Sequence, residues 1–257
     1  MLILIAESKT MLEEQQSISA ECLESNTPAG EEQAAIIMNR LGRMEQPELI
    51  AETGLTPSLA AKLRTMIYEF PNKTTGQKAI EAFTGVVFKA LSYDSLPVSA
   101  RETCGKDVRI VSSLYGLLRP GDIIKPYRLD FTAKAAPDGA SLNSFWKKDA
   151  TIQLVRTIQE GGHADILNLL PGDAAKCFDW KIIKRFCKVW KADFVEMTEN
   201  GTTKTPNATK LKTMRGTLLR SILCEGISSV KALQTIKSDD FMFEGTPVYP
   251  DHLQFIC

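Results

Sequence analysis

The sequence has little histidine and no closely spaced cysteines. Its 257 residues include two histidines, His163 and His252, and six cysteines, with no Cys-x-x-Cys pair. A closed zinc site needs four such ligands at short spacings, so we expect no metal site and interpret the cysteines as free thiols. No apolar run approaches the roughly 18 residues of a membrane-spanning helix, and the opening run at 2–5 is too short for the core of a secretion signal. These absences predict a cytoplasmic protein without membrane contact.

Several enzyme signatures are also missing. Lys73-Thr74-Thr75-Gly76 lacks the flanking glycines of a Walker motif, and the chain has no Gly-x-Gly-x-x-Gly, no nucleophile elbow and no His-Glu-x-x-His. The usual support for a kinase, a dehydrogenase, a hydrolase or a zinc protease is therefore absent, and we expect no cofactor. With 44% hydrophobic and 24% charged residues, the composition is that of an ordinary globular protein.

The charge is balanced overall but uneven along the chain. Thirty-one basic and 31 acidic residues give a net charge of zero, which argues against a protein that coats nucleic acid with its whole surface. Residues 1–56 hold three basic and ten acidic side chains, whereas residues 173–220 hold eleven basic and five acidic ones. This gradient permits one basic face that attracts phosphate, although solvated faces of unrelated helices would give the same pattern.

Mixed strand and helix patterns predict an α/β or α+β fold. Apolar or alternating runs predict strands at 2–6, 108–112, 164–170 and 187–198. Helices are expected at 11–24, 31–44, 47–53, 57–69, 77–83, 142–160 and 208–224, and residues 83–88 are expected as extended chain or turn. Because there are no repeats and no clear linker, we expect a single domain over 1–257. It would hold a mixed sheet flanked by helices and an inserted helical hairpin at about 47–69.

The first candidate site is this hairpin, whose residues 49–63 resemble a helix-hairpin-helix element. Gly54 permits the positive φ of a tight turn, and Pro57 suits the first position of the second helix. The N–H groups at this helix start would face outward as a phosphate site that reads no base sequence. Thr56 replaces the usual second glycine, and as an N-cap it would satisfy the free N–H groups itself. The predicted DNA contacts here are Gly54, Leu55, Thr56, Ser58 and Lys62.

The second candidate site is the loop region that follows the strand at 108–112. Three cations and two tyrosines in this region offer charge for a phosphate and rings for a nucleobase. The alternative is an ion pair of Arg128 with Asp122 or Asp130 that only holds the loop together. Later in the chain, the helix at 208–224 keeps Lys212 and Arg215 within one polar arc.

Six segments together carry a resemblance to a known family: MLILIAESKT at 1–10, AFTGVVFKAL at 82–91, RIVSSLYGLLRPGDIIKPYRLDF at 109–131, SFW at 144–146, ILNL at 166–169 and MRGTLLRSIL at 214–223. The sequence resembles the YaaA peroxide-stress-response family over nearly its whole length, most specifically at 114–129. The resemblance implies a single α/β domain of unusual topology with a helix-hairpin-helix element and a positively charged cleft. It also implies binding of double-stranded DNA and a cellular role in lowering free iron under peroxide stress.

The family's motifs carry over by position. Its strand-end lysine corresponds to Lys9, its Tyr-Gly-x-x-Arg-Pro to 115–120, its Pro-Tyr-Arg to 126–128 and its Arg-Gly to 215–216. The resulting set of cleft residues is Lys9, Tyr115, Arg119, Lys125, Tyr127, Arg128, Lys212 and Arg215.

Two segments depart from the family pattern. Ser-Pro-Ala-Lys-Thr is replaced by Ala6-Glu7-Ser8-Lys9-Thr10, and a Ser and acidic-Tyr stretch is replaced by Leu170-Pro171-Gly172-Asp173-Ala174. The first change adds the negative charge of Glu7 beside Lys9. If the cleft is catalytic in relatives, these departures weaken that activity here.

These observations lead to one expected function and two alternatives. We expect a DNA-binding protein that limits free iron and oxidative DNA damage. An enzyme acting on a nucleobase or nucleoside would instead present Lys9, Tyr115, Asn168 and Asp173 at the strand ends, with catalytic residues unassigned. Direct iron binding would depend on carboxylates in the first 56 residues and is the weakest alternative.

Overall fold

A central sheet of eight strands organises the structure, a computed structural model that describes residues 1–12, 16–72, 75–236, 238–245 and 249–257. The strands follow the order β10-β11-β8-β7-β1-β4-β5, and β9 pairs with β8. Their bounds are β1 Leu2–Ala6, β4 Val108–Ser112, β5 Gly116–Leu118, β7 Asp165–Asn168, β8 Lys188–Met197, β9 Thr203–Lys204, β10 Met242–Gly245 and β11 His252–Ile256.

The strands from β11 to β4 are parallel, whereas β5, β9 and β10 pair antiparallel to their neighbours. All of β1 is buried, as expected for a continuous apolar strand covered on both faces. In β1, Ile5 pairs with Ile110 of β4, and Leu2 pairs with Ile166 of β7. The strands predicted at 2–6, 108–112, 164–170 and 187–198 are therefore confirmed, with small differences at their ends.

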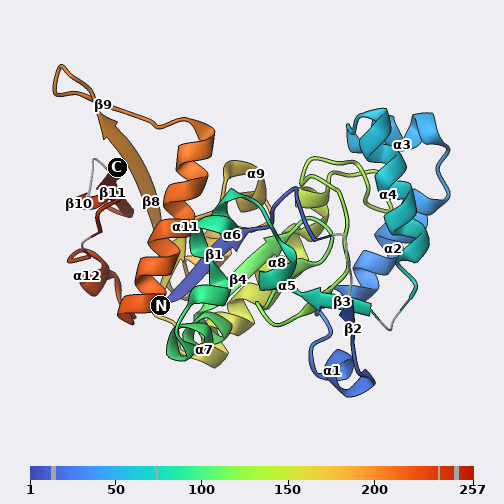
Figure 1. The fold of residues 1–257 in the computed structure, drawn as a ribbon, viewed down its shortest axis with the longest axis horizontal. Coiled ribbons are helices and arrows are strands. Elements are labelled where there is room, and N and C mark those ends of the chain that lie inside the picture. The colour runs from blue at the N-terminus through green and yellow to red at the C-terminus, as the bar shows by residue number, and fades with distance from the viewer. Residues whose placement is uncertain (13–15, 73–74, 237, 246–248) are drawn as a thin grey trace.

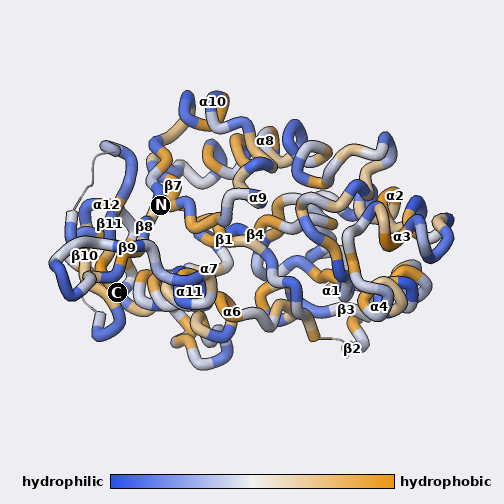
Figure 2. The backbone as a smooth tube through the Cα atoms, turned by 90° about the horizontal axis from the view of Figure 1, so that it is seen from above, coloured by the Kyte–Doolittle hydropathy of each residue, from blue (hydrophilic) through white to orange (hydrophobic). Residues whose placement is uncertain are grey.

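Helices cover both faces of this sheet (Figures 1 and 2). Seen from above, β1 and β4 lie between α6, α7 and α11 on one side and α8 and α10 on the other (Figure 2). This layering confirms the predicted α/β class. The helices of this part are α6 Val86–Leu91, η1 Tyr93–Ser95, α7 Val98–Asp107, α8 Leu142–Gly161, α9 Gly172–Ala175, α10 Trp180–Ile183, α11 Ala208–Glu225 and α12 Val230–Leu233.

The close contact between α6 and α11 depends on Gly216. A Cβ atom there would lie 2.2 Å from Val87 O and 2.7 Å from Ala90 Cβ, so a larger residue would force the helices apart. The expectation of extended chain or turn at 83–88 was wrong for its second half, because α6 begins at Val86. This short helix is stabilised by packing on α11, which the local sequence does not reveal.

The helices α2, α3 and α4 lie with α1 and a small sheet at the other end of the molecule (Figure 1). Both α2 and α3 pack against α4. The small sheet has the strand order β2-β3-β6. The elements of this end are β2 Gln16–Ser17, α1 Ala20–Ser25, α2 Glu31–Gly42, α3 Gln46–Thr53, α4 Pro57–Glu69, β3 Thr75–Lys78, α5 Ala79–Ala82 and β6 Ile123–Ile124.

Two helix predictions in this region were only partly right. The range 11–24 contains β2 and only the larger part of α1, and its residues 13–15 lie outside the described residues. The range 77–83 is divided between β3 and the short helix α5. In both cases the strand forms by pairing with a distant segment, β2 with β3 and β3 with β6, and this pairing overrides local helix propensity.

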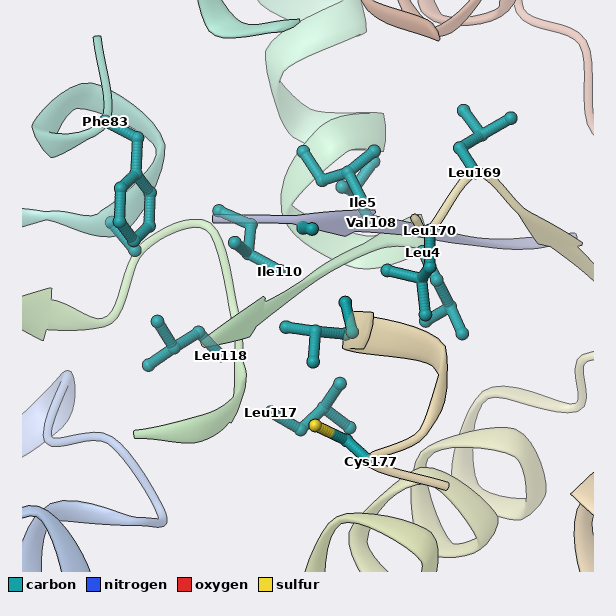
Figure 3. Close-up of a cluster of buried hydrophobic side chains, with 14 of the residues drawn as sticks. Leu4, Ile5, Phe83, Val108, Ile110, Leu117, Leu118, Leu169, Leu170 and Cys177 are labelled. Atoms are coloured by element: carbon teal, nitrogen blue, oxygen red, sulfur yellow. The ribbon is translucent and has the colours of Figure 1, made fainter. Parts of the chain in front are cut away.

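The hydrophobic core follows the central strands. Figure 3 shows Leu4 and Ile5 of β1 close to Val108 and Ile110 of β4. Trp146 of α8 is completely buried, and its Nε1 donates to Ser113 O at 2.9 Å. Among the described helices, none combines the length and apolar character required to cross a membrane.

Candidate functional site

The loops after β1 and β7 meet at one edge of the sheet. These two strands are neighbours in the central sheet. The next strand of this sheet after β1 is β4, beside β1, whereas the next strand after β7 is β8, on the opposite side of the pair. In open α/β sheets, ligands bind in the crevice at the carboxyl ends of strands where the connections diverge in this way. The segments that follow the strands here are Glu7–Lys9 after β1, Ser113–Tyr115 after β4 and Leu169–Leu170 after β7.

Glu7 turns inward from the end of β1. Its Oε2 accepts a hydrogen bond from Ser113 N at 2.8 Å and another from the Tyr127 hydroxyl. Burial raises the pKa of Glu7 from its ordinary 4.5 to about 7, although the hydrogen bonds from Tyr127 and Ser113 oppose the rise. Near neutral pH both protonation states are therefore populated. The negative charge expected beside Lys9 instead belongs to this internal network.

Tyr115 and Tyr127 are buried, with exposed fractions of 0% and 3%. The Tyr127 hydroxyl lies 2.7 Å from Ser112 Oγ, and the Tyr115 hydroxyl accepts a hydrogen bond from Lys125 N at 3.2 Å. The sequence predicted rings available to a nucleobase. The structure corrects this, because neither ring is exposed enough for a base to stack on it. Both tyrosines instead hold the loop that carries Arg128.

Two predicted cleft cations are paired with acidic side chains. Lys9 Nζ lies 2.6 Å from Asp130 Oδ1, and Arg119 Nε lies 2.7 Å from Asp122 Oδ1. Asp122 is buried and also accepts a hydrogen bond from Arg119 N at 2.8 Å, so this pair fixes the turn. A loop-holding Arg–Asp pair therefore exists, but its arginine is Arg119 and not Arg128.

Arg128 and Arg215, unlike Lys9 and Arg119, have no acidic partner in the described structure. Within the part of the chain that the structure describes, neither guanidinium has a hydrogen-bond or ion-pair partner. The Nη1 atom of Arg128 is buried without a hydrogen-bond acceptor. Burial alone lowers the pKa of Arg215, because no carboxylate lies close enough to oppose it. A partly buried charge without a counter-charge favours an external anion. Lys212, one turn before Arg215 on α11, is exposed.

Arg215 lines a pocket of about 450 Å³ between α11, the end of β7 and β8. Asn168, the last residue of β7, lines the same pocket. Its Oδ1 accepts a hydrogen bond from Leu170 N at 2.9 Å, while its Nδ2 has no partner among the described residues. The pocket therefore offers two hydrogen-bond donors from elements that are far apart in the sequence.

The predicted helical hairpin is present as α3 and α4. Gly54 ends α3 with a φ of 67°, and Leu55 is buried behind the turn. Thr56 caps α4, because its hydroxyl accepts a hydrogen bond from Leu59 N at 3.4 Å. Thr56 and Ser58 are both exposed. The structure thus confirms the turn geometry and the Thr56 cap, whereas phosphate contact at this turn stays a prediction.

A groove of about 330 Å³ connects the hairpin with the loop that carries Arg128, and Lys62 and Lys125 both line it. Lys125 Nζ donates to Phe70 O at 2.5 Å and lies 5.6 Å from the centre of the Phe70 ring. Further along the same loop, Lys134 N donates to Glu52 O of α3 at 2.8 Å. The loop therefore connects the Glu7 network with the hairpin.

Other residues singled out in the sequence lie elsewhere. Asp173, expected beside Asn168 in the enzyme hypothesis, is exposed and pairs with Lys176 at 2.9 Å. His252 Nδ1 lies 2.5 Å from Asp193 Oδ2, a pair that sequence spacing did not suggest because it forms between β11 and β8. In the described part of the chain, no group of three or more His, Cys, Asp and Glu side chains is placed to hold a metal ion.

Comparison with known proteins identifies the family. Residues 1–246 match the family described as peroxide stress protein YaaA. A UPF0246 protein of Parabacteroides distasonis is 30% identical over 258 residues, which covers 100% of this chain and 99% of that protein. UPF0246 proteins of Francisella philomiragia and Bacteroides fragilis are 29% and 28% identical, over 84% and 95% of this chain and 85% and 93% of their own lengths. The chain therefore belongs to the YaaA family of peroxide stress proteins and has a general role in the response to oxidative stress.

Proposed function

We propose that this protein binds double-stranded DNA during peroxide stress and acts to limit free intracellular iron and oxidative damage to DNA. Membership of the peroxide stress family supports the cellular setting. The iron-limiting part has only the family resemblance as its support. The DNA-binding part has a physical argument of its own, which concerns positive charge without an internal partner.

The observation that carries the proposal is the unpaired state of Arg128. Its Nη1 is buried without an acceptor in the described structure, whereas the nearby cations Lys9 and Arg119 are neutralised by Asp130 and Asp122. A guanidinium in this state has already lost part of its hydration, so it gains more than a fully solvated one from an arriving phosphate. Arginine also fits phosphate with two parallel hydrogen bonds.

The hairpin provides a second region for contact with the same ligand. The exposed start of α4 carries the positive end of a helix dipole, and Lys62 follows one turn later. Contacts of this kind position a duplex without reading its sequence. Because one loop connects Arg128 with α3, both regions are held in a fixed relation to each other.

Fluorescence anisotropy of a labelled duplex at several salt concentrations tests the proposal. The variants are Arg128→Gln and the matched control Arg156→Gln, which removes the same charge from an exposed position on α8. Each phosphate contact contributes about 0.9 to the slope of log affinity against log salt. We expect Arg128→Gln to weaken binding and lower the slope by about 0.9, and Arg156→Gln to change neither.

Three results would contradict DNA binding at this loop. The first is that the folded protein does not bind the duplex, and the second is that binding does not depend on salt. The third is that Arg128→Gln and Arg156→Gln have equal effects, because the charge at Arg128 would then act only through the net charge of the protein.

A second candidate function, an enzyme acting on a nucleobase or nucleoside, is favoured by the Glu7 network. A carboxyl group with a pKa of about 7 at the end of β1 has the protonation behaviour of a general acid or base at neutral pH. Its test is incubation with a broad nucleoside panel and chromatographic detection of products. Turnover that Glu7→Gln abolishes would support this candidate, and absence of turnover with every member of the panel would remove it.

A further inference from the structure

The pocket beside Arg215 has a feature that duplex binding does not require. Its volume of about 450 Å³ lies within the range of small-molecule sites, whereas contacts with a DNA backbone need a charged surface and no enclosed space. The pocket also lies at the carboxyl end of β7, beside the point where the connections of β1 and β7 diverge. Its position and its size therefore both indicate a site for a small ligand.

Two polar side chains of the lining, Arg215 and Asn168, favour an oxyanion. Arg215 has no acceptor in the described structure, and the Nδ2 group of Asn168 is also without one. The other charged residues of the lining, Lys191 and Asp193, balance each other, because Lys191 Nζ lies 2.8 Å from Asp193 Oδ1. Asp193 Oδ2 also lies 2.5 Å from Nδ1 of His252, which is outside the lining. Among the described residues of the lining, Arg215 is thus the charge without a counter-charge, and an anionic ligand can neutralise it.

The rest of the lining suits a flat apolar group. Leu169 and Leu211 contribute aliphatic surface, and the exposed ring of Tyr249 lies at the pocket. The centres of the Tyr249 and His252 rings are 5.0 Å apart, which supports the tyrosine ring from one side. An exposed aromatic face next to an arginine is the combination that holds a base and its phosphate.

We propose that this pocket binds a single nucleoside monophosphate, free or as the phosphorylated end of a DNA strand. The phosphate bonds to Arg215 and the Nδ2 group of Asn168, and the base lies against Tyr249 and the aliphatic wall. The proposal extends the proposed function, because both assign phosphate to an arginine that has no acidic partner in the described structure. It differs in the ligand, which is one nucleotide and not the backbone of a duplex.

The close contact of α11 with α6 explains how the site is held. Gly216, next to Arg215, brings the two helices together and so fixes the backbone from which the Arg215 side chain extends. A side chain on a fixed backbone loses less conformational entropy on binding than one on a mobile segment. This arrangement gives a reason for the Arg-Gly sequence at 215–216.

Isothermal titration calorimetry with a set of matched ligands tests the proposal. The ligands are the monophosphates of adenosine, guanosine and thymidine, the same nucleosides without phosphate, ribose 5-phosphate, and a duplex with or without 5′-phosphates. We expect saturable binding of at least one monophosphate, and binding at least tenfold weaker for its nucleoside and for ribose 5-phosphate. A 5′-phosphate that strengthens duplex binding would identify a strand end as the source of the nucleotide, and no effect would identify the free nucleotide.

Two pocket variants and one control locate the site. Arg215→Gln removes the charge, and Asn168→Asp keeps the acceptor for Leu170 N while replacing the amide donor with a carboxylate oxygen. Each is expected to weaken monophosphate binding by about tenfold or more, whereas Arg156→Gln leaves it unchanged. Because an unpaired charge does not stabilise the fold, Arg215→Gln should not lower the melting temperature. If it does not fold, Asn168→Asp decides the question.

The outcomes separate this proposal from DNA binding. Absence of monophosphate binding at millimolar concentration, or binding that neither pocket variant weakens, would overturn the pocket proposal while leaving Arg128-dependent duplex binding untouched. Binding of nucleoside and monophosphate with equal affinity would overturn the role of Arg215. Conversely, pocket-dependent binding of a monophosphate by a protein that does not bind duplex would support the pocket and remove the proposed DNA function.

Discussion

Replacing Glu7 by glutamine isolates the effect of one buried carboxyl group on stability. Glu7 accepts hydrogen bonds from Ser113 N and the Tyr127 hydroxyl on a single oxygen, so the glutamine Oε1 can take over both contacts. The variant therefore keeps the shape of the network and removes its titration. Any pH dependence that differs between the two proteins belongs to Glu7.

The size and the sign of this difference follow from the pKa. Burial raises the pKa of Glu7 from 4.5 in the unfolded chain to about 7 in the folded protein. The folded state then binds the proton more tightly, so its stability falls as the pH rises. At 1.36 kcal/mol for each pH unit, the wild type should lose about 3 kcal/mol relative to Glu7→Gln between pH 4.5 and 7. The difference should level off about one unit above the folded-state pKa, near pH 8.

Urea denaturation followed by circular dichroism, at half-unit steps from pH 4.5 to 8.5, measures this difference. A third protein, Tyr127→Phe, extends the test. The Tyr127 hydrogen bond lowers the pKa of Glu7, so its removal should move the upper end of the pH window above 7. A constant difference between wild type and Glu7→Gln across this range, or a wild type that gains stability relative to Glu7→Gln on going from pH 4.5 to 7, would refute the argument.

Four further substitutions test the packing that supports the site. Gly216→Ala should lower the free energy of unfolding by about 1–3 kcal/mol, because its Cβ would lie 2.2 Å from a carbonyl oxygen of α6. Gly105→Ala in α7 should raise the free energy of unfolding by up to about 1 kcal/mol, because its Cβ would have no atom within 4 Å. Urea denaturation of both variants checks this, and the same sign for both would contradict it. Gly54→Ala should lower the stability by about 1 kcal/mol because residue 54 has a φ of 67°, although its Cβ would have no atom within 4 Å. Thermal unfolding checks this, and an unchanged melting temperature would argue against backbone strain. Trp146→Phe removes the 2.9 Å hydrogen bond to Ser113 O and leaves a void. We expect the free energy of unfolding, measured by urea denaturation, to fall by about 2–4 kcal/mol. A decrease below about 1 kcal/mol would contradict this expectation.

Part of the site was visible in the sequence because its signals are local. The apolar run at 2–6 is long enough to specify a strand buried on both faces, and it places the loop with Lys9 at the strand end. Gly54 and Pro57 identify the hairpin, since a positive φ and a helix start depend on single residues. The long helices α2, α8 and α11 were predicted nearly in full for the same reason, because their periodic patterns extend over several turns.

The remainder depends on which distant segments meet. Short elements such as α6 and β3 form because α11 and β6 lie against them. The expectations of extended chain at 83–88 and of a helix at 77–83 were therefore each only partly right. The same dependence decides the chemistry of the site. Lys9 and Arg119 find carboxylates, whereas Arg128 and Arg215 find none in the described structure.

The sequence by itself determined the α/β class, the central strands, the hairpin turn and the residue types available to a phosphate. Only the tertiary structure decided that Tyr115 and Tyr127 are buried, that Glu7 turns inward, and that Arg215 shares a pocket with Asn168. The physical reason is that secondary structure depends largely on neighbouring residues. Burial, ion pairing and pKa depend instead on what surrounds a side chain in space, and here those surroundings come from segments as far apart as β1 and α11.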